Sequence, residues 1–262
     1  MQEYLLTKAA RDLTPQEAFD LLMHHIEQGD IDLFDPRQAR ADINGKMLSL
    51  RVNQNVKIMP TMAGVQYVHT LGDARAFSPK PEFAIFLLRF ARWLSEQCSV
   101  VKIVWGGIGS GSGKNAVDCH SDGRCIDFYG AQTAGGQYFD VDRDWWQKSV
   151  TLKTEPKPHA LVGTDRWGND RKTYYRLALP VQPLHHFWAG WFFGMVYEFA
   201  MKESTVSSAD IGVDAFRRGD EVKAGAIFHP DHPIPGSFGV RGIAGRRTHF
   251  QHMHFGLGKA IG

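Results

Sequence analysis

The sequence predicts an α+β fold, in which a small antiparallel sheet is flanked by helices and preceded by an N-terminal lobe of helical and hairpin structure. Apolar residues recur at helical spacing in three segments. Short β-branched or alternating runs lie between them and stop at turn residues, as strands do. A boundary near residue 80 divides the 262 residues into a lobe over 1–80, of unassigned role, and a second domain over 81–262.

The N-terminal lobe begins with a helix whose start is marked by the tetrapeptide TPQE at residues 14–17. This order places threonine at the N-cap, proline at the first helical position and glutamate at the third, which favours a capping box. Apolar positions continue the helix to an end near Gly29. Further on, an Asn44-Gly45 turn before a short alternating strand predicts a hairpin in this lobe.

In the second domain a helix leads into a buried strand. Apolar side chains at helical spacing predict a helix from Pro81 to Cys98, and the β-branched run from Val100 to Trp105 predicts a strand. The apolar segment 183–203 predicts a core helix that covers a sheet. Alternation over 248–256 predicts a final strand, on which residues two positions apart face the same way.

Charge and hydropathy exclude two kinds of partner. The formal net charge is +2 and the basic residues are scattered, so the chain lacks the basic stripe of a nucleic-acid surface and no nucleic-acid partner is predicted. No run approaches the roughly 20 apolar residues that span a bilayer, which predicts no membrane span. The N-terminal residues lack the basic-then-apolar order of a secretory signal, so we expect synthesis in the cytoplasm without a signal peptide.

Two histidine clusters far apart in the chain together predict a zinc site. The first, HSDGRCID, contains His120 and, seven residues later, Asp127; the second, THFQHMHF, contains His252 and His254. A turn at 121–123 joins two extended pieces and would bring His120 and Asp127 to one metal ion from neighbouring strand ends. Catalytic zinc is typically held by three protein ligands, with a fourth position open for water. The two clusters supply three such ligands.

The three cysteines have two interpretations. Cys98, Cys119 and Cys125 cannot all pair, and an odd small count argues against a disulfide scaffold. Cys119 and Cys125 flank His120, so one interpretation makes them thiolate ligands of zinc. That interpretation leaves Asp127 and the C-terminal histidines unused, so the favoured one makes the two cysteines small apolar fillers beside the site.

The tract from Gln132 to Arg176 is polar and irregular but rich in aromatic side chains. Trp145, Trp146 and Trp167 within it are typical of a binding loop, and equally of a loop packed by its own aromatics. They are the candidate substrate-binding residues.

The two motifs resemble those of the zinc peptidases that unite D-alanyl-D-alanine carboxypeptidases, lysostaphin-like endopeptidases and the hedgehog signalling domain, often called the LAS superfamily. The resemblance rests on residues 101–127 and on the C-terminal histidine cluster. It implies that His120, Asp127 and His254 are the Zn²⁺ ligands. It also implies that His252 stands beside the metal-bound water.

One departure from the family pattern affects the chemistry. Carboxypeptidases of this group place a catalytic glutamate three residues before the last zinc ligand, and Gln251, which cannot accept a proton, holds that position here. The order His249-x-x-His252-x-His254 is similar to that of penicillin-insensitive murein endopeptidases and implies His252 and His249 as the catalytic residues. Asp122 is a fallback base, although a turn aspartate more often caps backbone groups.

The resemblance implies a zinc-dependent peptidoglycan peptidase, favouring an endopeptidase that cleaves stem-peptide cross-links. Such an enzyme would act in the periplasm or on the cell wall after delivery by another route, as lysins and antibacterial toxins do, with an immunity or carrier protein as a further partner. The alternatives are a non-catalytic zinc-containing binding module, a cytoplasmic dipeptidase for D,D- or L,D-dipeptides, and a structural zinc in an unrelated fold.

Overall fold

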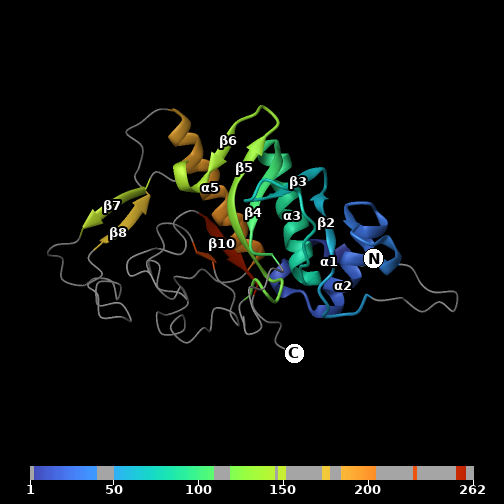
Figure 1. Cartoon of the computed structure of the whole chain (residues 1–262). Coiled ribbons are helices and arrows are strands. Elements are labelled where there is room, and N and C mark those ends of the chain that lie inside the picture. The colour runs from blue at the N-terminus through green and yellow to red at the C-terminus, as the bar shows by residue number, and fades with distance from the viewer. Residues whose placement is uncertain are drawn as a thin grey trace, which may run out of the picture.

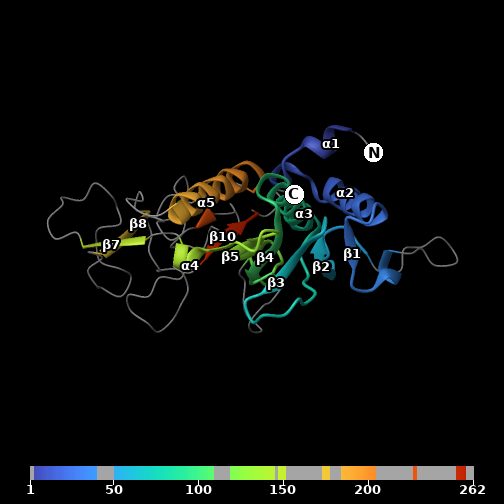
Figure 2. The same cartoon turned by 90° about the horizontal axis from the view of Figure 1, so that it is seen from above.

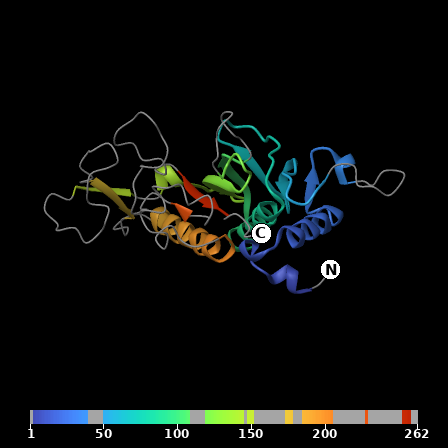
Figure 3. The same ribbon diagram turned by 90° about the horizontal axis from the view of Figure 1, so that it is seen from below.

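The computed structural model of the chain shows an α+β fold in two layers, with helices on one face of a mostly antiparallel sheet (Figure 1). It describes residues 3–39, 50–108, 119–144, 147–151, 173–177, 184–204, 227–228 and 252–257. The helices α2, α3 and α5 lie on the same side of the sheet, as Figure 2 and Figure 3 show from opposite directions. The predicted fold class is therefore confirmed.

The elements of the described residues divide into one large sheet, a separate ribbon and the helices. The helices are α1 (Glu3–Thr7), α2 (Pro15–Glu27), α3 (Pro81–Cys98), α4 (Val141–Asp144) and α5 (Leu184–Glu203), with 3-10 turns η1 (Ala10–Asp12) and η2 (Pro36–Ala39). The large sheet contains β1 (Ile31–Leu33), β2 (Ile58–Met62), β3 (Val65–His69), β4 (Val100–Gly106), β5 (Cys125–Thr133), β6 (Tyr138–Asp140), β9 (Ile227–Phe228) and β10 (Met253–Gly256). The ribbon pairs β7 (Gln147–Thr151) with β8 (Thr173–Leu177).

The large sheet has the order β1-β2-β3-β4-β5-β10-β9, and β6 also pairs with β5. Neighbouring strands are antiparallel except β3 and β4, which are parallel and are connected through α3. This pairing carries the sheet across residue 80, where the sequence predicts a boundary between two domains. Strands from both predicted domains therefore build one sheet.

The helices begin and end close to their predicted positions. Thr14 Oγ1 accepts a hydrogen bond from the Glu17 backbone N–H at 3.3 Å, and Glu17 Oε2 accepts one from the Thr14 N–H at 2.7 Å, which completes the predicted capping box. The helix α3 has its predicted bounds, and α5 starts one residue after the predicted segment. None of the described helices is both long enough and apolar enough to cross a membrane.

The described hairpin of the N-terminal lobe lies at a different turn from the predicted one. Asn44-Gly45 falls outside the described residues, whereas β2 and β3 pair across Ala63 and Gly64. Both residues have positive φ, 46° and 78°, as a two-residue hairpin turn of type I′ requires. Sequence reasoning missed this turn because alanine seldom adopts that conformation.

The core between the helices and the sheet is aromatic at its centre. Phe90 of α3 lies 5.5 Å from Phe128 of β5 and 5.8 Å from Phe255 of β10, measured between ring centroids. Phe199 of α5 lies 5.5 Å from Phe90 on the same side. Phe128 and Phe255 are fully buried, so the helix-covered face of β5 and β10 belongs to the core.

Candidate metal centre

Asp127 and His254 face each other across the β5–β10 pair. The register matches His254 to Asp127 and, one position to each side, Met253 to Phe128 and Phe255 to Ile126. Side chains alternate along a strand, so the pairing that buries the two phenylalanines under the helices places Asp127 and His254 together on the other face. His254 Nδ1 lies 3.1 Å from Asp127 Oδ1.

His120 reaches the same carboxylate oxygen from the turn before β5. Its Nε2 lies 3.4 Å from Asp127 Oδ1, and its ring meets that of His254 edge to face at 4.8 Å. The sequence predicts His120 on a strand end, but the structure places it within a turn. The reason is that the chain reverses before it enters β5. Two backbone hydrogen bonds close this turn, one from Gly123 N–H to the His120 carbonyl and one from Arg124 N–H to the Cys119 carbonyl, so the turn begins at residue 119.

Gly107 provides the space that His120 occupies. It follows β4 with a φ of +80°, a conformation that favours glycine. A Cβ at this position would overlap the imidazole of His120, with Cε1 only 2.8 Å away. His120 Nδ1 is buried and, in the part of the chain that the structure describes, has no hydrogen-bond partner. The orientation of His120 therefore depends on close packing against the Gly107 backbone.

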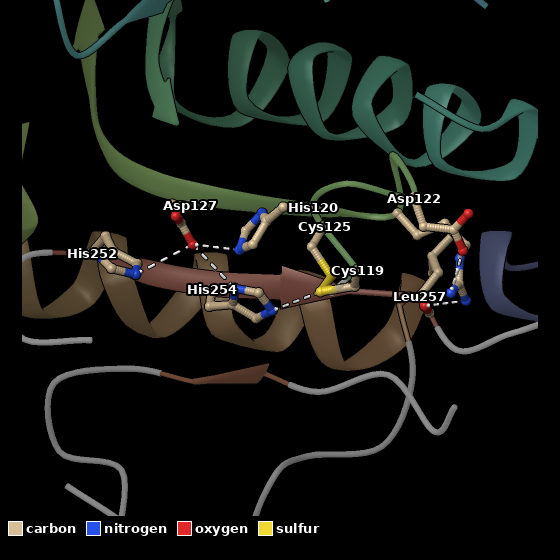
Figure 4. Close-up of a disulfide and its surroundings, with 9 residues drawn as sticks. Cys119, His120, Asp122, Cys125, Asp127, His252, His254 and Leu257 are labelled. Atoms are coloured by element: carbon tan, nitrogen blue, oxygen red, sulfur yellow. Dashed lines mark hydrogen bonds and ion pairs between the residues drawn. A yellow bond between two sulfur atoms is a disulfide. The ribbon is translucent and has the colours of Figure 1, made fainter. Parts of the chain in front are cut away.

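His252 lies on the same face of the sheet as His254, as their two-residue spacing predicts. Its Nε2 is 3.3 Å from Asp127 Oδ1, so three histidines surround one carboxylate oxygen (Figure 4). The ring of Tyr129 packs against that of His252 at 5.0 Å. Sequence reasoning did not single out Tyr129. The signal was present, because Tyr129 follows Asp127 by two positions on a strand and so shares its face.

Burial and charge set the protonation of the cluster. Burial by itself raises the pKa of the Asp127 carboxyl, but the charges of His252 and His120 and hydrogen bonds from His252 and His254 hold that pKa well below its usual value. Burial lowers the pKa of His254 to about 4, although its hydrogen bond to Asp127 opposes the shift. An ionised carboxylate and a neutral imidazole are the forms that bind a metal ion at neutral pH.

The donor set fits a metal ion. One donor atom each from His120, Asp127 and His254 lies within 4.8 Å of the other two. Tetrahedral zinc with bonds of about 2.0 to 2.2 Å separates neighbouring ligand atoms by roughly 3.3 Å. The separations from Asp127 Oδ1 are 3.4 Å to His120 and 3.1 Å to His254. The three residues predicted as ligands are therefore brought together at a spacing that suits metal coordination.

The cysteines correct an expectation, because Cys119 and Cys125 form a disulfide and are not unpaired apolar fillers. An odd count excludes full pairing but does not exclude one local bridge. The turn at 120–123 returns the chain so that the two Cα atoms lie 5.3 Å apart, within the range that a disulfide spans. Cys98 at the end of α3 is free. The bond also excludes thiolate ligands at these positions while it is formed.

The disulfide contacts the ring of His254 on the side away from Asp127. Cys119 Sγ lies 3.6 Å from His254 Nε2, whereas Nδ1 of the same ring faces Asp127. Figure 4 shows His254 between the disulfide and the carboxylate. Both cysteines are buried, Cys119 being 5% exposed and Cys125 1%.

Asp122 supports the turn and does not join the cluster. Its Oδ2 accepts a hydrogen bond from Arg124 Nε at 2.7 Å and lies 2.6 Å from Arg124 Nη2. Arg124 is 2% exposed and also donates from Nη1 to the Leu257 carbonyl at 3.2 Å. Through the buried Arg124, this ion pair ties the turn that carries His120 to the end of β10.

Several predicted site residues fall outside the part of the chain that the structure describes, and their roles stay predictions. They are His249, Gln251, Trp145, Trp146 and Trp167.

Comparison of the chain with protein-family models, curated proteins and solved structures gives no match. The likeness to zinc peptidases therefore consists of the two motifs alone, without support from overall similarity. Function has to be inferred from the donor set and its surroundings.

Proposed function

We propose that this protein is a zinc metallopeptidase that cleaves peptide cross-links of peptidoglycan. The observation that carries the proposal is the convergence of His120, Asp127 and His254 on one point, with His252 against the same carboxylate oxygen. Three nitrogen and oxygen ligands are the donor set of catalytic zinc, whereas structural zinc is usually closed by four ligands. The resemblance of the two motifs to peptidases of the LAS superfamily supplies the substrate class.

In this proposal the chain's residues have separate roles. His120, Asp127 and His254 hold zinc, which when bound lowers the pKa of a water molecule toward about 7 and polarises the scissile carbonyl. His252 accepts the proton of the attacking water and returns it to the leaving amine. The Asp127 carboxylate, 3.3 Å from His252 Nε2, stabilises the charge that His252 acquires. Tyr129 keeps the imidazole in place through its ring.

The disulfide supports a place of action outside the cytoplasm. Disulfides persist in oxidising compartments such as the periplasm and cell surfaces, and peptidoglycan lies there too. We therefore propose that the protein acts in the periplasm or on the cell wall, as a lysin or a delivered antibacterial toxin does. A carrier or an immunity protein would be its partner in that setting.

A binding module without turnover is the second candidate. Among the described residues, Asp127 is the one carboxylate of the three-donor cluster and would be occupied as a ligand. Gln251 stands where related carboxypeptidases have their catalytic glutamate. Both observations favour a protein that binds zinc and a peptide but leaves the peptide intact.

Digestion of isolated peptidoglycan separates the candidates. Zinc-loaded protein is incubated with peptidoglycan, with and without chelator, and the fragments are identified by mass spectrometry. We expect chelator-sensitive loss of cross-linked dimers. His252→Ala should keep stoichiometric zinc but lower the rate by about 10²- to 10⁴-fold, the usual contribution of a general base. His24→Ala on α2, away from the cluster, is the matched control.

Other outcomes would redirect the proposal. Intact dimers beside stoichiometric zinc would indicate the binding module. Cleavage of free D,D- or L,D-dipeptides alone would indicate a dipeptidase. Full activity of His252→Ala would contradict its role as the base. Unfolding of the protein when zinc is removed would indicate a structural metal.

A further inference from the structure

The ring of His254 lies between two sets of metal-binding groups. Its Nδ1 faces Asp127 Oδ1 at 3.1 Å, and its Nε2 faces Cys119 Sγ at 3.6 Å. Donor atoms of Cys119, Cys125 and His254 also lie within 4.8 Å of one another, and all three residues are buried. This second set consists of two sulfurs and one nitrogen, groups that zinc binds well once the sulfurs are thiolates.

A neutral imidazole can serve only one of these sets at a time. One ring nitrogen carries a lone pair and the other a proton. When Nδ1 binds a metal ion, Nε2 carries the proton and points it at the cysteine sulfur. When Nε2 binds a metal ion, Nδ1 carries the proton and donates it to Asp127. Metal binding at one set therefore removes His254 from the other.

We propose that reduction of the disulfide creates a second zinc site, formed by Cys119, Cys125 and His254, that takes the metal ion away from the set formed by His120, Asp127 and His254. In the oxidised protein the two sulfurs are bonded to each other, so only the set formed by His120, Asp127 and His254 can bind the metal ion. The disulfide thus decides which donors hold zinc. The site itself does not depend on the proposed peptidase function.

The redox step balances with a thiol reductant. Two successive thiol–disulfide exchanges with a dithiol such as dithiothreitol convert the protein disulfide to two cysteine thiols and the dithiol to its cyclic disulfide. Two electrons and two protons pass to the protein sulfurs. Zinc then displaces the two thiol protons to water as it binds the thiolates.

For a peptidoglycan hydrolase this arrangement would tie activity to compartment, a consequence that rests on the proposed function. In a thiol-rich cytoplasm the chain would hold zinc between the cysteines and His254, with His252 and Asp127 beside no metal ion. In an oxidising compartment the bridge would form and leave zinc to the histidine and aspartate set.

Cobalt substitution tests the site without any measurement of activity. The full chain is reduced, freed of dithiothreitol by anaerobic gel filtration and given one equivalent of Co²⁺, and an oxidised sample is treated in parallel. We expect the intense near-ultraviolet thiolate-to-cobalt absorption band in the reduced sample only. Thiol titration in denaturant should give three thiols after reduction, against the single free Cys98 before it.

Variants assign the ligands. Cys119→Ser should lower the thiolate band to about half or less, because one of the two thiolates is lost, whereas Cys98→Ser, a cysteine at the far end of α3, should keep it. His254→Ala should weaken cobalt binding by the reduced protein as well as by the oxidised protein, because both sets share it. The double variant Cys119→Ser, Cys125→Ser should bind cobalt alike, and without the band, under both conditions.

Two results would overturn the inference. One is a fully reduced wild-type protein whose cobalt spectrum lacks the thiolate band, whether it stays folded or loses its far-ultraviolet circular dichroism. The other is undiminished cobalt binding by reduced His254→Ala. Failure of the proposed function looks different, because oxidised zinc protein would leave peptidoglycan intact while the cobalt spectra still changed with reduction.

Discussion

The two faces of the β5–β10 pair carry opposite chemistry within one alternating pattern. On the helix-covered face, Phe128 and Phe255 pack on Phe90 in the aromatic core. On the other face, their neighbours Asp127 and His254 form the centre of the candidate metal site. A slip of one residue in register would exchange the two faces. The difference teaches that core packing and the candidate metal centre are specified by the same pairing.

The two faces also differ in how their members are held. The aromatic face is fixed by burial between sheet and helices. On the polar face, strands carry Asp127 and His254, whereas His120 comes from a turn. That turn is fixed by the disulfide and by the Asp122–Arg124 ion pair. Changes on the two faces should therefore separate stability from metal affinity.

The largest effect is expected from removing the ligand shared by all proposed sites. His254→Ala should abolish stoichiometric zinc binding, a loss well beyond the roughly 10- to 100-fold typical when only a residue that orients a ligand is changed. The metal-free variant should keep a melting temperature close to that of the metal-free parent. Competition with a chromophoric chelator gives the affinity, and His24→Ala is the control. Zinc affinity within tenfold of the parent would exclude this cluster as the metal site.

A change on the aromatic face should act on stability instead. Phe128→Ala removes a fully buried ring and should lower the free energy of unfolding by about 3 to 5 kcal/mol, measured by urea denaturation of the metal-free protein. Phe34→Ala is the matched control, because Phe34 is 52% exposed. This substitution should lower the free energy of unfolding by less than about 1 kcal/mol. Equal losses would contradict the assignment of this face to the core.

A smaller and more local effect is expected where the backbone meets His120. Gly107→Ala should lower zinc affinity by about 10- to 100-fold, as expected when a ligand loses its orientation, because the added Cβ displaces the imidazole. Gly136→Ala separates this displacement from backbone strain, since Gly136 has a similar φ of +84° but open space around a Cβ. If both variants lose affinity equally, close packing against His120 is not the cause.

The smallest effect concerns Glu82, at the start of α3 in the helix layer. Burial raises the pKa of its carboxyl, although Lys80 and Arg124 oppose the shift. A raised pKa in the folded state stabilises the fold fully at low pH and loses that contribution as pH rises through the folded value. Wild-type protein should therefore lose more stability than Glu82→Gln between pH 4 and pH 7.

Urea denaturation of metal-free protein at both pH values measures this difference. Glu96→Gln, at an exposed position of the same helix, is the control and should follow the wild type. A Glu82→Gln variant that also follows the wild type would show that burial does not disturb this carboxyl.

Local elements were predictable from the sequence because their signals are local. The capping box at 14–17, the helix at 81–98 and the shared face of His252 and His254 follow from spacing alone. The pairing of β10 with β5 does not, because alternation tells which side a residue faces and not which strand lies beside it. Asp127 and His254, separated by 127 positions, were joined through the zinc-ligand pattern of the two clusters and the resemblance to a known family, and not through any signal of strand pairing.

The parts that were missed have physical explanations as well. The odd number of cysteines argued against a disulfide scaffold, but it carries no information about the chain reversal that brings Cys119 to Cys125. Gly107 and Tyr129 carried visible signals, a glycine after a strand and a residue two positions from a predicted ligand. Their importance became evident only when His120 and His252 were placed against them.

The distance between β5 and β10 along the chain also means that the two strands are synthesised at different times. Asp127 is made 127 residues before its partner on β10, which at about 5 to 20 residues per second is a delay of roughly 6 to 25 s. During that interval the nascent chain already carries Cys119, His120, Cys125 and Asp127, but not His252 or His254. A metal ion that binds so early meets the thiols of Cys119 and Cys125, the imidazole of His120 and the carboxylate of Asp127, and His254 becomes available only when the last strand docks.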